Sequence, residues 1–123
     1  MRNLIGDAFL LGQSGEEMDV TLLENVVIES DEEWWELFYK DVPRVLKRAL
    51  SENGLSCTIY YKKDDVPGHR YLANCSTIRT GRRVALGFDV EYDQELGEVY
   101  LCLATAWRDV SWTKNQLTHY HEV

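Results

Sequence analysis

The run of residues 30–53 has the hydrophobic spacing of an amphipathic helix. Its start, Ser30-Asp31-Glu32-Glu33, matches a capping box, and Asn53-Gly54 is a stop signal. Pro43 interrupts the pattern, so we expect either a kink there or a split in which Asp41 caps the second half. The apolar residues recur at steps of three and four and would form one stripe; they are Trp34, Trp35, Phe38, Val42, Val45, Leu46, Ala49 and Leu50.

After Gly54 the apolar residues alternate with polar ones, which is typical of strands. Short turns separate four such segments, so we interpret them as an antiparallel meander. The segments are residues 55–62, 71–77, 84–92 and 99–107. The flanks are less regular: residues 18–29 suit one strand or two short ones, residues 4–11 a short amphipathic helix, and residues 112–123 a last strand or a docked tail.

The turn centres predict which residues lie opposite each other. They place Cys57 opposite Cys75, Cys75 opposite Leu86, and Leu86 opposite Ala104. The helix-facing side of the sheet is then expected to contain Leu55, Cys57, Ile59, Tyr71, Ala73, Cys75, Val84, Leu86, Phe88, Val90, Tyr100, Cys102 and Ala104. The other side would carry Val99, Leu101, Leu103 and Trp107, which a terminal segment would have to cover.

These elements predict an α+β fold. It consists of an antiparallel β-meander of about four to six strands, with one main helix, kinked or straight, packed on one face. The length of 123 residues lies near the commonest domain size, so we expect a single domain, 1–123. Hydrophobic residues make up 45% of the chain and charged residues 28%, which excludes a disordered protein.

The three cysteines, Cys57, Cys75 and Cys102, are an odd number at wide spacing and do not form a disulfide framework. All three fall on the expected core face, where we interpret them as small apolar packing residues. Cys57 and Cys75 would be close enough to cross-link under oxidation. The apolar run at 4–11 is too short for a signal peptide or a membrane span. We therefore expect a cytoplasmic protein with free thiols and no membrane partner.

Catalytic and cofactor motifs are not recognisable in the chain. Its glycines form no phosphate cradle, since Gly15 is followed by Glu16 and Glu17. The carboxylates around residues 89–98 lie at a hairpin tip, without the cleft of a glycosidase or the spacing of a calcium loop. We predict no catalytic residue, no metal and no cofactor. The sequence leaves open whether the histidines bind a metal; they are His69, His119 and His121.

Charge is distributed in blocks along the chain. The formal net charge is −8, which excludes direct binding to nucleic-acid phosphates. Residues 1–36 hold ten acids and one base (net −9), residues 37–88 four acids and ten bases (net +6), and residues 89–123 seven acids and two bases (net −5). If the two acidic blocks meet in space, they form an anionic face that would attract a basic partner. Trp34 and Trp35 cannot both face the core, so one is expected at the surface, where tryptophan often anchors interfaces.

The sequence therefore predicts a small acidic binding protein that engages and inhibits a basic protein partner. In length, charge and lack of catalytic motifs it is similar in kind to immunity proteins that neutralise nuclease toxins and to inhibitors of nucleic-acid-binding complexes. The expected partner-binding residues are Glu29, Asp31, Glu32, Trp35, Asp89, Glu91, Tyr92, Asp93, Glu95 and Glu98. One alternative is a secretion-type chaperone or assembly subunit that uses the apolar part of the second sheet face. The other is a small enzyme or ligand-binding domain with a pocket between helix and sheet lined by Tyr60, Asn74, His69 or Asp89. The sequence does not determine the oligomeric state.

Overall fold

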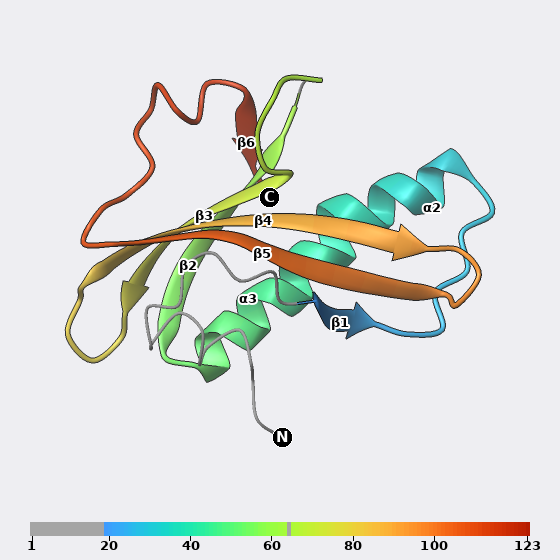
Figure 1. The fold of residues 1–123 in the computed structure, drawn as a ribbon, viewed down its shortest axis with the longest axis horizontal. Coiled ribbons are helices and arrows are strands. Elements are labelled where there is room, and N and C mark those ends of the chain that lie inside the picture. Colours follow the sequence, from blue (N-terminus) through green and yellow to red (C-terminus); the bar gives the residue numbers. More distant parts are fainter. Residues whose placement is uncertain (1–18, 64) are drawn as a thin grey trace.

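A computed structural model describes residues 19–63 and 65–123, in which a long helix lies across one face of a six-stranded antiparallel sheet (Figure 1). The strand order is β1-β5-β4-β3-β2-β6. The strands are β1 (Asp19–Leu23), β2 (Leu55–Lys62), β3 (Tyr71–Thr77), β4 (Arg83–Asp93), β5 (Glu98–Arg108) and β6 (Tyr120–Glu122). The α+β class is confirmed. The helix expected at residues 4–11 lies outside the described residues.

The helical region has three continuous parts. They are α2 (Asp31–Glu36), the π-helical segment η1 (Leu37–Asp41) and α3 (Val42–Glu52). The predicted start is confirmed: the Ser30 hydroxyl accepts the Glu33 N–H at 3.2 Å, and the Glu33 carboxylate accepts the Glu29 N–H at 2.9 Å. The predicted end is confirmed as well, since Asn53 is the C-cap residue.

Pro43 is accommodated by a π-helical turn rather than by a split. Val42 donates its N–H to the Leu37 carbonyl, five residues back. The next bond of this ladder would run from residue 43 to the Phe38 carbonyl, but proline has no N–H to donate. The Tyr71 hydroxyl fills that place by donating to the Phe38 carbonyl at 2.7 Å. The alternative in which Asp41 caps a second helix is wrong, because Asp41 has helical dihedrals and makes no capping bond.

The core lies between this helix and the sheet. Phe38, Val42, Leu46 and Leu50 from the helix are fully buried, and they belong to one cluster with Tyr71 and the other core residues. Burial raises the pKa of the Tyr71 phenol, and the neighbouring Tyr61 adds to the effect. Tyr71 therefore keeps its proton and serves as the donor to the Phe38 carbonyl.

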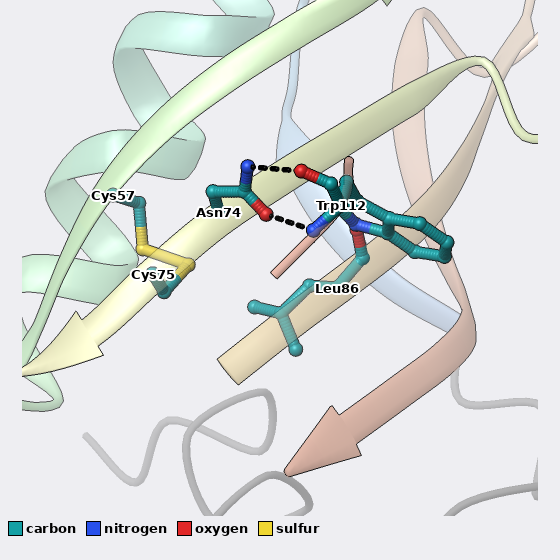
Figure 2. Close-up of a disulfide and its surroundings, with 5 residues drawn as sticks. All are labelled: Cys57, Asn74, Cys75, Leu86 and Trp112. Carbon is teal, nitrogen blue, oxygen red and sulfur yellow. Dashed lines mark hydrogen bonds between the residues drawn. A yellow bond between two sulfur atoms is a disulfide. The ribbon is translucent and has the colours of Figure 1, made fainter. Parts of the chain in front are cut away.

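The pairing of β2 with β3 is as predicted, with Cys57 opposite Cys75. Their Cα atoms are 4.1 Å apart, and the two sulfurs form a disulfide (Figure 2). In this structure the two cysteines are therefore oxidised, whereas three thiols were expected. In the next pair Cys75 lies opposite Val84 rather than Leu86. This shift of two residues leaves every side chain on its predicted face.

The β4–β5 hairpin contradicts the predicted faces of β5. Val90, on the helix side of β4, pairs with Leu101, and both Leu101 and Val99 are fully buried in the core. The connection has four residues, 94–97, whereas the prediction centred the turn on one residue. A shift of one residue moves every side chain to the opposite face. The residues wrongly placed on the helix side are Tyr100 and Cys102; the placement of the Ala104 side chain lies outside what the structure describes.

A β-bulge at Ala104 changes the alternation again further along β5. Beyond it Ala106 packs against the core, whereas Thr105 and Trp107 pair with the outward-facing residues of β4. We call the sheet face away from the helix the outer face. The terminal segments do not need to cover Leu101, because it already lies in the core; β1 and β6 extend the sheet at its two edges instead.

We expect the Tyr71→Phe variant to lose about 1–3 kcal/mol of unfolding free energy, because the buried Phe38 carbonyl would lose its donor. Urea denaturation followed by circular dichroism measures the change. Tyr60→Phe, at a partly exposed position of the neighbouring strand, serves as the control and should shift stability by less than about 0.5 kcal/mol. Equal effects of the two substitutions would contradict this role of Tyr71.

The Cys57–Cys75 disulfide closes a loop with a sequence separation of 18. By the chain-entropy estimate it contributes about 3 kcal/mol, so a reductant should lower the stability of the oxidised protein by that order. The same urea experiment with and without dithiothreitol measures the difference. Cys102→Ser should respond to the reductant as the unmodified protein does, whereas Cys57→Ala/Cys75→Ala should not respond. A reductant response that persists in the double variant would show that the disulfide is not its cause.

Candidate functional site

The two acidic segments of the chain lie side by side at one end of the molecule (Figure 1). The segment between β1 and α2 is tied to the β4–β5 hairpin by two bonds: the Val26 N–H donates to the Gly97 carbonyl at 2.8 Å, and the Tyr92 hydroxyl donates to the Val26 carbonyl at 2.7 Å. Gly97 has a φ of +65°, and a Cβ there would lie 3.1 Å from the Val26 carbonyl oxygen. A glycine therefore permits both the turn and this close approach.

We call this region the acidic end. Residues 19–39 and 89–107, which supply it, contain no lysine or arginine. Ten carboxylates therefore gather without a basic residue from either segment, which makes this end strongly anionic. They belong to Glu24, Glu29, Asp31, Glu32, Glu33, Glu36, Glu91, Asp93, Glu95 and Glu98.

Large apolar side chains are exposed among these carboxylates. Trp35 is 51% exposed and its ring lies 4.6 Å from that of Tyr39, and Trp34 is 39% exposed although its ring packs on that of Phe38 at 4.5 Å between centroids. The prediction of a surface tryptophan is confirmed for Trp35, but Trp34 does not lie in the core either. Leu96 at the hairpin tip is 62% exposed. The acidic end thus combines charge with the aromatic and aliphatic surface that interfaces use.

The predicted partner-binding residues occupy different local settings. The Asp93 carboxylate accepts the N–H groups of Glu95 and Leu96 and so shapes the turn, and Glu98 accepts the Tyr100 hydroxyl at 2.6 Å. The exposed members are Asp31, Glu32, Glu91 and Glu95, in addition to Trp35 and Glu29. Tyr92 holds the two segments together. Asp89 lies further down β4 on the outer face and does not belong to the acidic end.

The opposite end of the molecule is basic. Arg79 and Arg82 lie in the β3–β4 turn, and Arg83 and Arg108 lie at the adjacent strand ends. Because β4 has 11 residues, its two ends are about 34 Å apart. These arginines thus lie far from the acidic end, although the two charge blocks are not wholly separated, since Asp109 of the last block contacts Arg82 at 3.5 Å.

A second polar arrangement, which the sequence did not predict, lies on the outer face. His69, just before β3, contacts Asp89 of β4 through Nδ1 and Thr105 of β5 through Nε2, both at 3.0 Å. The ring lies against Gly87, where a Cβ would come within 2.6 Å of it. Gly87 within the alternating run was a signal for such a close approach. The long separation of His69 from Thr105 explains why no local pattern revealed the contact.

Tyr120 of β6 completes the support of His69 by donating its hydroxyl to the His69 carbonyl at 2.6 Å. Burial, and secondly the Asp89 carboxylate, raise the pKa of the Tyr120 phenol, so it stays a donor. Of the other histidines, His121 packs against Tyr39 at 5.0 Å. Within residues 19–63 and 65–123, no three His, Cys, Asp or Glu side chains are grouped closely enough to hold a metal ion.

The chain matches no protein-family model, no curated protein and no solved structure. A membrane-spanning helix is also not found among the described residues. Functional inference therefore depends on the chemistry of the two surfaces described above.

We expect Tyr92→Phe to loosen the acidic end locally, because it removes the hydroxyl that binds the Val26 carbonyl. A lost hydrogen bond of about 1 kcal/mol corresponds to roughly fivefold faster amide exchange at Val26. Hydrogen exchange measured by NMR tests this. The Gly81 amide, which bonds to Thr77 in the opposite hairpin, provides the internal control and should be unaffected. Unchanged protection at Val26 would mean that this bond does not hold the two segments together.

Proposed function

We propose that the protein binds a basic partner protein through its acidic end and inhibits it. The main observation in support is that the two acidic segments lie together at one end of the molecule, where Trp35, Val27 and Leu96 are exposed. Carboxylates with complementary charge accelerate encounter with a basic surface, and large apolar side chains slow dissociation.

A hollow beside Trp35 offers a specific point of attachment. Its volume is about 480 Å³, and it is lined by three glutamates, by the rings of Trp35 and Tyr39, and by one basic residue, Lys40. A lysine or arginine side chain placed there would meet carboxylates and the face of an aromatic ring, the two groups that attract an organic cation most strongly. The partner is thus expected to insert a basic side chain at this position.

Inhibition follows from competition for the partner's basic surface. A nuclease toxin or a nucleic-acid-binding complex uses lysine and arginine to neutralise phosphates. Carboxylates at the acidic end would occupy the same cations and exclude the nucleic acid. This is an immunity- or inhibitor-type function without catalysis, cofactor or direct contact with nucleic acid.

The proposal places the protein in the cytoplasm. There the Cys57–Cys75 pair would be held as two thiols, because glutathione and thioredoxin keep cytoplasmic cysteines reduced. The binding surface does not include the disulfide. The acidic end is therefore expected to bind equally well with the pair oxidised or reduced.

The chaperone alternative loses part of its basis. It depended on an apolar outer face containing Val99 and Leu101, and both are buried on the helix side of the sheet. A ligand-binding role is favoured by a separate observation, an apolar pocket on the outer face that is lined by Thr105 and Trp107.

The experiment compares two variants with the same change of charge. Glu32→Gln/Glu91→Gln/Glu95→Gln neutralises three exposed acids of the acidic end, and Glu52→Gln/Asp65→Asn/Glu122→Gln neutralises three exposed acids elsewhere. Each tagged protein is used to capture and cross-link partners from its native cells at low and at high salt. We expect a basic protein to be captured, with about tenfold weaker binding by the first variant and less than twofold by the second.

Trp35→Ala separates the apolar contribution from the charge. Once the partner is identified, we expect this variant to dissociate about tenfold faster with an unchanged association rate, whereas the charge variant associates more slowly. Equal capture by both charge variants, or a captured partner that is not basic, would refute the proposed function.

A further inference from the structure

The outer face holds an apolar pocket that is distant from the acidic end in the fold. Its volume is about 510 Å³, within the range of small-molecule sites. The apolar walls are Trp107, Trp112, Val110 and Ala85, and Thr105 forms part of the floor of the same pocket. Ala85 pairs with Trp107 across β4 and β5, so a small residue beside a large one leaves the space open.

Trp112 is a rigid wall (Figure 2). Its backbone N–H donates to the Asn74 amide oxygen at 2.6 Å, and its carbonyl accepts from the Asn74 amide nitrogen at 3.2 Å. The indole Nε1–H donates to the Leu86 carbonyl at 2.9 Å. Three hydrogen bonds thus fix both backbone and ring, so a ligand that stacks there does not have to order this side chain.

The Asp89–His69–Thr105 chain has a defined direction. Asp89, as a carboxylate, only accepts, so His69 carries its proton on Nδ1. In the neutral imidazole Nε2 is then the acceptor, and the Thr105 hydroxyl donates to it. The Thr105 hydroxyl therefore donates to His69, and its oxygen lone pairs can accept a hydrogen bond from a bound molecule.

We propose that this pocket binds a small flat aromatic molecule that carries one N–H or O–H donor, such as an indole or a phenol. The ring stacks on the tryptophan walls, and its donor bonds to the Thr105 hydroxyl oxygen. The orientation of the Asp89–His69–Thr105 chain makes the site select a donor over an acceptor. This binding activity is independent of the acidic end and of its partner.

The test uses probes of nearly identical shape at about pH 8, where imidazole is ordinarily neutral. Indole carries a donor, benzofuran an acceptor at the same position, and indene neither. Binding is followed by NMR shifts of the Trp107 and Trp112 indole signals. We expect indole to bind about five- to tenfold more tightly than benzofuran, which is the ratio expected for one hydrogen bond.

Two substitutions test the role of the hydrogen bonds that connect Asp89, His69 and Thr105. Thr105→Val keeps the shape and removes the acceptor, so indole should bind no more tightly than indene. Asp89→Asn should abolish the preference. The Arg70 N–H donates to Asp89 Oδ1 at 3.2 Å, so the asparagine oxygen keeps that position and its NH₂ faces Nδ1 of His69. The proton of His69 then moves to Nε2, which donates to Thr105, and the threonine hydroxyl can either donate to benzofuran or accept from indole.

Glu91→Gln is the matched control, because it removes a carboxylate from the same strand, two residues from Asp89, outside the pocket. It should bind all three probes as the unmodified protein does.

N-acetyl-tryptophanamide, the same ring on a peptide backbone, tests a protein side chain as the natural occupant. Tighter binding of this amide than of indole would overturn the small-molecule assignment. Equal binding of indole and benzofuran by the unmodified protein, or an undiminished preference for indole in Asp89→Asn, would overturn the proposal.

Discussion

The hydrogen bond from the Tyr71 hydroxyl to the Phe38 carbonyl joins the helix to a central strand of the sheet. It exists because Pro43 deprives that carbonyl of its ladder donor within a π-helical turn. Removal of the donor would leave a carbonyl in the core without compensation, so the position of the proline and that of the tyrosine constrain each other. The bond is one point at which the helix is fixed to the sheet, together with the apolar core, and from there α2 leads toward the β4–β5 hairpin (Figure 1).

Short-range sequence patterns were sufficient to predict the elements that depend on interactions between residues close together in the chain. The Ser30 cap and the Cys57–Cys75 pairing followed from short-range spacing, and the structure agrees with both. The faces of β5 could not be predicted, because they depend on whether a turn has an odd or even number of residues and on one bulge. The acidic blocks were recognisable as charge, but their meeting depends on a contact between Tyr92 and Val26, which are 66 residues apart. The contact between His69 and Thr105 is long-range in the same sense.

The molecule has two candidate surfaces with different chemistry. The acidic end presents exposed carboxylates and Trp35, a surface that suits a large charged partner and is weakened by salt. The outer-face pocket presents pinned Trp112 and an oriented hydroxyl, which suits a small neutral ring. Asp89 shows why composition alone was misleading here: it was grouped with the hairpin acids, yet its carboxylate is engaged by His69 and Arg70. A carboxylate that orients a neighbouring side chain and one that attracts a distant charge look the same in a sequence.

The bulge at Ala104 has a consequence for how this chain can vary during evolution. On one side of it β5 supplies Val99 and Leu101 to the core, and on the other it supplies Thr105 and Trp107 to the pocket. A one-residue deletion in the 94–97 turn would reverse both halves of the strand, and deletion of the bulge residue would reverse the second half alone. Deletions at both places would therefore restore Thr105 and Trp107 but leave Val99 and Leu101 on the wrong face. The core constrains the length of the turn, and the pocket constrains the bulge.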